Sequence, residues 1–149
     1  MRCSIIPNSS LSAFSVVSAL MVSSVALAIV ACGPPKNYTP VAEIPKLQTL
    51  KDVMDVQATT ADPQFKKMDA TAYSDAEFAE LADTAQKIDA TSKHIKDFSK
   101  GPGFDALADQ LNAKAAALGQ AAAAKDAAGA SKALSEMKAT CKSCHSQFK

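Results

Sequence analysis

The pattern Cys-x-x-Cys-His at residues 141–145 constrains the fold of this chain more than any other feature of its sequence. On a helix, Cys141 and Cys144 are three residues apart and His145 follows Cys141 by four, so the three side chains share one face. Two thiols on one face can form thioethers to one edge of a porphyrin, and the imidazole can then reach its iron. This spacing is the attachment signature of a c-type haem. We therefore predict one covalently bound haem c, with Cys141 and Cys144 as the thioether residues and His145 as the proximal iron ligand.

Three other interpretations of these cysteines compete with haem. The thiols could form a disulfide or a redox pair of the thioredoxin kind, but that kind lies near a βαβ pattern, which this chain lacks. A zinc site needs four ligands, and the only other histidine is His94, with no second pair of closely spaced cysteines. The histidine directly after Cys144 and an export signal at the start of the chain favour haem.

Residues 1–31 are predicted to be a bacterial lipoprotein signal peptide. Arg2 gives a positive start, residues 11–31 are apolar apart from scattered serines, and small or aliphatic residues precede Cys32. These residues resemble a lipobox, which implies cleavage after Ala31 and lipid attachment to Cys32. Ordinary cleavage near Ala31 and an uncleaved anchor are the alternatives, because residues 11–31 are long enough to span a bilayer. We expect a periplasmic protein anchored to a membrane by lipid. The lack of an aspartate after Cys32 favours the outer membrane by analogy.

Residues 32–45 are predicted to be an extended tether without helix. Their prolines are dense, and proline-rich segments act as semi-rigid spacers. These prolines are Pro34, Pro35, Pro40 and Pro45. The folded domain is expected to cover residues 46–149.

The first helix is expected to run from Pro45 to about Gln57. Apolar residues repeat there at helical spacing, with Met54 on the inward face beside Leu47 and Leu50. Residues 59–63 are expected to interrupt it, and Asp62-Pro63 could cap a short turn that carries Phe65 and Met68.

Three further helices follow. Ser74 and Glu77 form a capping box that predicts the start of the second helix, and the Gly-Pro-Gly at residues 101–103 ends it. The third helix begins at Phe104. Residues 125–130, with Asp126 as a cap, separate it from the fourth helix, which carries the haem motif. Four amphipathic helices joined by short turns predict an all-α fold, an antiparallel four-helix bundle.

Composition agrees with this fold. Tryptophan is absent, alanine is abundant, and valine and isoleucine become rare after the first third of the chain, which favours helix over strand. The alanines of the third helix fill little volume, so a haem between the helices could supply apolar bulk. The formal charge is +1 with no basic patch that interleaves aromatics, so nothing indicates a nucleic-acid partner.

Residues 47–149 resemble cytochrome c prime and its low-spin relatives, the class II cytochromes c. The resemblance rests on the haem motif of Cys141, Cys144 and His145 on the last of four helices, with Phe148 and Lys149 behind it. It implies a left-handed bundle, often a homodimer, whose last helix holds the haem and whose first helix covers the distal face. It also implies bacterial electron transfer or the binding of small gases.

Two functions follow from these predictions. The first is a membrane-tethered, periplasmic one-electron carrier that exchanges electrons with redox partner proteins. The alternative is a five-coordinate haem protein that binds nitric oxide or carbon monoxide. An enzyme such as a peroxidase is not expected, because the sequence places no acid–base pair and His94 stands alone.

The distal ligand decides between the two functions. Met137 precedes His145 by two turns of the same helix and cannot reach across the ring, which leaves Met54, Met68 and His94. Met54 is favoured, because it lies on the inward face of the first helix, which covers the distal face in the resembled family. A thioether opposite imidazole suits electron transfer. Otherwise Met54 is a core filler, and a side chain such as Leu50 caps a five-coordinate iron.

Overall fold

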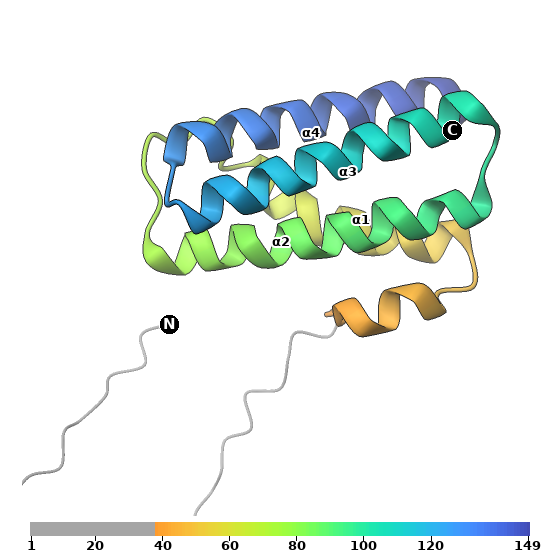
Figure 1. Ribbon diagram of the computed structural model, residues 1–149, viewed down its shortest axis with the longest axis horizontal. Helices are drawn as coiled ribbons and strands as arrows, with labels where there is room; N and C mark the ends of the chain where they lie inside the picture. The colour runs from red at the N-terminus through yellow and green to blue at the C-terminus, as the bar shows by residue number, and fades with distance from the viewer. Residues whose placement is uncertain (1–37) are drawn as a thin grey trace, which may run out of the picture. The chain divides into compact units, whose positions relative to one another are not determined.

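The computed structural model describes residues 38–149, and within this range the chain is helical and contains no strand. The elements are η1 (Val41–Lys46), α1 (Leu50–Phe65), α2 (Asp75–His94), η2 (Ile95–Phe98), α3 (Pro102–Ala123) and α4 (Ala127–Phe148). The four α-helices run alternately up and down and are joined by short turns (Figure 1). This arrangement confirms the predicted antiparallel four-helix bundle.

Two helices begin at the predicted caps. Ser74 and Glu77 form a complete capping box at the start of α2. Asp126 accepts a hydrogen bond of 3.0 Å from the backbone N–H of Gly129 and caps α4. Gly101, with φ of 112°, precedes Pro102 at the first turn of α3. Only glycine adopts this φ without strain, so the Gly-Pro-Gly segment begins α3. The predicted end of the second helix at this segment is wrong, because α2 ends at His94 and η2 ends at Phe98.

The expected interruption of the first helix at residues 59–63 is wrong. The helix starts later than predicted, at Leu50 with Thr49 as its cap, and continues through Pro63 to Phe65. Pro63 lies in the last turn, two residues before the helix ends at Phe65, so a bend at this proline affects little of the helix. Ala61 and Gln64 are buried on either side of it. Their burial favours a continued helix over a turn.

Part of the stretch predicted as an extended tether is also helical. Residues 41–46 form the 3₁₀-helix η1, with Pro45 inside it, and η1 packs against α2. Ile44 is fully buried there, so a single apolar side chain draws the segment onto the bundle. The predicted signal peptide and Cys32 lie outside the described residues. Among residues 38–149, no helix combines the length and the hydrophobicity needed to cross a membrane.

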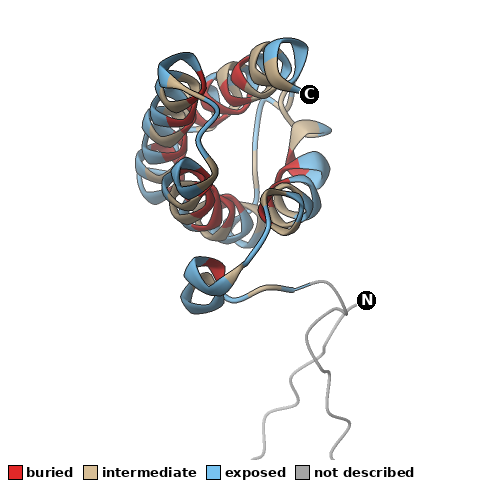
Figure 2. Cartoon of the chain, turned by 90° about the vertical axis from the view of Figure 1, so that its right-hand side faces the viewer, coloured by how far each residue is buried: buried red, intermediate tan, exposed pale blue. Residues whose placement is uncertain are grey.

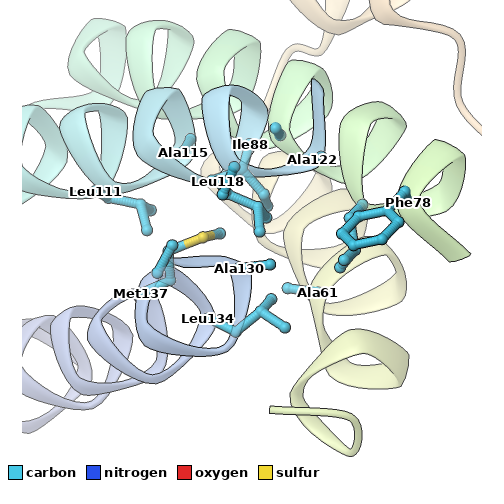
Figure 3. Packing of buried hydrophobic residues seen from close by; sticks show 14 residues of the cluster. Ala61, Phe78, Ile88, Leu111, Ala115, Leu118, Ala122, Ala130, Leu134 and Met137 are labelled. Atoms are coloured by element: carbon cyan, nitrogen blue, oxygen red, sulfur yellow. The ribbon is translucent and has the colours of Figure 1, made fainter. Parts of the chain in front are cut away.

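The core divides into two clusters. The larger, here called the packed cluster, joins α2, α3 and α4 through large side chains in direct contact; its members include Leu81, Ile88, Leu118, Leu134 and Met137. Figure 3 shows Leu111, Leu118 and Met137 gathered between α3 and α4. The smaller, the α1 cluster, consists of Val53, Ile95, Phe104 and Ala108.

The contacts between helices are uneven. The extensive contacts lie between α2 and α3 and between α3 and α4, whereas α1 contacts α4 only sparsely. The end-on view shows the four helices arranged in a ring, with buried residues turned toward its centre (Figure 2). The side where α1 faces α4 is therefore the part of the bundle with the least direct helix packing.

Candidate haem site

The last two turns of α4 carry the haem motif. Cys141 and Cys144 are partly buried, are not joined in a disulfide, and pack against different clusters, Cys141 against the packed cluster and Cys144 against the α1 cluster. The side chain of His145 is exposed. The regular α-helix over these residues gives the shared face that the spacing predicted.

A pocket lies against this face. It contains about 730 Å³ of space not filled by protein atoms, part of it open to solvent. Its apolar lining and the three motif side chains mark it as a candidate cofactor site. Cys141, Cys144 and His145 all line it. The remaining lining residues are mostly apolar and come from α1, α2, η2, α3 and α4: Met54, Gln57, Ala58, Ala61, Asp62, Phe65, Ile88, Ile95, Phe104, Leu107, Ala108, Leu111, Met137 and Thr140.

Small side chains on α1 keep the pocket open. Ala58 and Ala61 lie one and two turns after Met54, so α1 approaches α4 without filling the space between them. A second pocket of about 520 Å³ adjoins the first, and the two share Met54, Ile95, Phe104, Cys144 and His145. Phe104 and Phe148 meet edge to face, with ring centroids 5.4 Å apart, and Phe148 lines the second pocket. The two pockets are mainly apolar and share Met54 and His145 in their linings.

The structure separates the candidate distal ligands. Met54 of α1 lines the pocket and faces α4. Met68 lies beyond the end of α1, where it packs against the packed cluster. Both ring nitrogens of His94 lie at hydrogen-bonding distance from other groups, with Nδ1 2.9 Å from Asp97 Oδ2 and Nε2 2.9 Å from the Leu47 carbonyl oxygen. Met137 is fully buried and lines the pocket from the same helix as His145. Of the favoured candidates, Met54 alone shares the pocket with His145.

The two thiols do not have the properties of a redox pair. Burial raises the pKa of Cys141 to about 11, with a smaller contribution from the charge of Cys144, and burial also raises the pKa of Cys144. A reactive thiol of the thioredoxin kind requires a lowered pKa, because the thiolate is the nucleophile. Residues 38–149 contain no group of three or more His, Cys, Asp or Glu side chains placed to hold a metal ion.

Two pocket residues escaped the sequence analysis. Gln57 is buried one turn after Met54, and its Nε2 donates a hydrogen bond of 3.2 Å to Thr91 Oγ1. Because the Thr91 hydroxyl donates to the Lys87 and Ile88 carbonyls, it can only accept from Gln57, and this fixes the orientation of the amide. Asp62 places a carboxylate at the exposed rim of the pocket. The helical spacing from Met54 was the signal that could have identified Gln57.

The residues present fit a haem. The pocket is large and mainly apolar, two thiols and an imidazole line it from one helix, and a thioether lines it from the facing helix. Cys141 and Cys144 would hold the porphyrin, and His145 would ligate its iron; Met54 lines the same pocket from α1. When bound, the haem supplies a one-electron Fe(III)/Fe(II) couple. A helical bundle with this site defines a c-type haem protein.

The comparisons with known proteins agree. The sequence model of the family described as Cytochrome C' matches residues 45–149. The chain belongs to the cytochrome c' family, and it is a c-type cytochrome with a covalently attached haem c. Members of this family are in general electron carriers or gas-binding haem proteins, not catalysts. Neither the curated proteins nor the solved structures gave a match.

Proposed function

We propose that this cytochrome is a one-electron carrier whose haem is attached through Cys141 and Cys144 and ligated by His145 and Met54. The observation that carries the proposal is the position of Met54, which lines the same apolar pocket as His145 from the facing helix. His94 is engaged with Asp97 and Leu47, and Met68 packs elsewhere. These positions leave Met54 as the best placed distal ligand from outside α4.

Two protein ligands suit electron transfer. An iron that keeps the same ligands in both oxidation states needs little rearrangement, and a thioether opposite imidazole raises the reduction potential. The apolar side chains that line the pocket would limit the access of water to a bound haem. Gln57, held by Thr91, fixes a polar group one turn from Met54 without offering a competing ligand.

The deciding experiment is the optical spectrum of Met54→Ala. The wild-type protein should be low-spin, with a sulfur-to-iron charge-transfer band in the red that the variant loses. The reduced wild type should bind carbon monoxide poorly and the variant should bind it readily. Met68→Ala is the matched control and should keep the wild-type spectrum. A wild type that is already high-spin and avid for carbon monoxide would refute the carrier.

Gas binding is the second candidate function. It is favoured by Ala58 and Ala61, whose small side chains leave space beside Met54 for a diatomic ligand. In that case Met54 packs in the core and the iron is five-coordinate, and nitric oxide or carbon monoxide occupies the distal side. The same carbon monoxide titration separates the two functions.

We also propose that the haem is attached covalently through Cys141 and Cys144. Mass spectrometry of protein matured by a c-type haem assembly system should show one haem retained after denaturation and acid–acetone extraction. Free extraction of the haem would contradict the attachment. His145→Ala should remove the proximal ligand and leave the mass added by the attached haem unchanged.

We further propose that the cytochrome is periplasmic and lipid-anchored through Cys32, with the outer membrane as the favoured site. The support is the lipobox-like sequence before Cys32, which lies outside the described residues. Cys32→Ser should abolish metabolic labelling with palmitate and release the protein from membranes. Unchanged labelling of the variant would rule out this anchor.

A further inference from the structure

The lysines of the described chain fall into two groups. Nine form ion pairs with carboxylates: Lys46, Lys51, Lys67, Lys87, Lys93, Lys96, Lys114, Lys125 and Lys132. Within residues 38–149, the other lysines have no carboxylate within ion-pairing distance; they are Lys66, Lys100, Lys138, Lys142 and Lys149. We call these five the lysine face.

The lysine face borders the haem site. Lys138, Lys142 and Lys149 are spaced by four and seven residues along α4, so they lie on the same side of the helix as His145. The Nζ of Lys138 lies 5.9 Å from the centroid of the Phe65 ring, which lines the pocket from α1. This side of α4 therefore faces α1, along the mouth of the pocket.

The other two lysines extend the face at its ends. Lys66 directly follows Phe65 at the end of α1. Lys100 donates a hydrogen bond of 2.7 Å to the Phe148 carbonyl oxygen and lines the second pocket together with Lys149. Asp62 is the one carboxylate that lines the first pocket, and it lies at its rim. Positive charge thus dominates the border of the site.

The rest of the described chain is acidic. Apart from the lysine face, residues 38–149 contain nine lysines and fifteen carboxylates. Positive charge without a carboxylate partner therefore lies along the α1–α4 side of the molecule, beside the haem site. A polarised charge distribution orients an approaching partner and raises its association rate. Stabilisation of the end of α4 by cations explains Lys149, but Lys138 lies too far from that end to contribute.

We propose that the lysine face is the docking surface for an acidic redox protein, which exchanges an electron with the haem across the pocket mouth. The inference rests on the proposed carrier function and names the kind of partner. The step is a one-electron transfer in which the partner loses an electron and ferric iron gains it, with no bond formed or broken. Two haem propionates would lower the positive charge of this border without cancelling five lysines.

The test uses the haem-loaded full chain and a reduced, strongly acidic flavodoxin as the probe donor. The stopped-flow rate should fall at least about tenfold between about 10 mM and 1 M salt, as screening shortens the Debye length from roughly 30 to 3 Å. Lys138→Glu/Lys142→Glu should lower the low-salt rate about tenfold and remove most of the salt dependence. Lys138→Arg/Lys142→Arg should retain the wild-type rate.

The matched control is Lys125→Glu/Lys132→Glu. It makes the same change in net charge near the start of α4, where both lysines pair with carboxylates. It should leave the flavodoxin rate within about twofold of wild type. Reduction by uncharged tetramethylhydroquinone should be equal in all variants.

Several outcomes would overturn the inference. Equal slowing in both charge-reversal variants would show a net-charge effect without a docking face. A changed haem spectrum or slower hydroquinone reduction in Lys138→Glu/Lys142→Glu would place these lysines in the haem site itself. If Lys138→Glu/Lys142→Glu loses binding to phosphatidylserine vesicles but keeps the wild-type flavodoxin rate, the lysine face is a membrane-binding surface. A wild type reduced by neither donor would refute the carrier function, and the docking face with it.

Discussion

The packed cluster and the haem pocket lie in the same bundle but are filled in different ways. Around Leu118 and Leu134, both fully buried, the side chains of three helices complete the core by themselves. Between α1 and α4, the small side chains of Ala58 and Ala61, with Ala108 of α3, leave a pocket that is partly open to solvent. The side chains of α2, α3 and α4 thus form a core without a cofactor. We expect only the packing of α1 against α4 to depend on the cofactor.

Removal of the haem should cause the largest loss of stability, and this loss should affect the pocket and not the packed cluster. Cys141→Ala/Cys144→Ala prevents attachment, and the pocket then loses the group that joins α1 to α4. A ligand at a thousand times its Kd stabilises the folded state by about 4 kcal/mol, and we expect a loss of at least that size. Denaturant unfolding should show it. Hydrogen exchange should show α1 less protected than in the loaded protein while α3 keeps its protection; unchanged protection of α1 would contradict the division.

The second largest effect should come from truncating a large side chain, whose cost in stability should differ between the packed cluster and the pocket. Leu118→Ala removes a fully buried side chain from the packed cluster and should cost about 3 kcal/mol, with or without haem. Leu107→Ala, which alters a half-buried wall of the pocket, should cost less than about 1 kcal/mol in the haem-free protein and more in the loaded one. Paired chemical denaturation of loaded and haem-free proteins measures both. A Leu118→Ala cost that depends on haem would argue against a self-sufficient packed cluster.

A smaller effect should come from the hydrogen bond that joins α1 to α2. Thr91→Val leaves the buried Nε2 of Gln57 without its acceptor, which should cost about 1–3 kcal/mol. In a double-mutant cycle, Gln57→Leu should recover part of this cost, with a coupling of about 1 kcal/mol. The coupling should be the same with and without haem, because it does not cross the pocket. Its loss in the haem-free protein would show that α1 leaves α2 as well as α4.

The smallest expected effect is the pH dependence of the α2 cap, far from the pocket. Hydrogen bonds from the Ser74 backbone N–H and hydroxyl lower the pKa of Glu77 below its usual value. A carboxyl whose pKa is lowered by folding stabilises the protein above its unfolded pKa of about 4.3, and this stability is lost as pH falls through the folded pKa. Ser74→Ala should therefore destabilise the protein slightly at neutral pH and less at acid pH. The difference in unfolding midpoints across pH measures this; a difference independent of pH would exclude Glu77 as the cause.

The reliable sequence predictions were those that depend on local chemistry. The capping box at Ser74 and the cap at Asp126 satisfy backbone groups within one turn, and the structure confirms both. The haem motif predicted a shared helical face in the same way. The roles of Cys141, Cys144, His145 and Met54 stay predictions.

The wrong and missing predictions depend on contacts between distant residues. Pro63 and Pro45 indicate breaks locally, but burial of Ala61 and of Ile44 keeps both segments helical. Gln57 looked like an ordinary polar residue, and its buried hydrogen bond to Thr91 is set by the packing of α1 on α2. The pattern of a single sequence does not show which residues far apart in the chain come into contact.

The 3₁₀-helix η1 has a mechanical consequence. Its fully buried Ile44 packs toward α2, and the ring of Tyr38 lies 3.7 Å from the Nζ of the buried Lys87. Tension that reaches the domain through the residues before Tyr38 must first extract Ile44, at a cost of about 2 kcal/mol, before it acts on Thr49 and α1. Because η1 packs on α2, it transmits this load to α2, which belongs to the packed cluster. Pulling at that end of the chain therefore loads η1 and α2 before it reaches α1 and Met54.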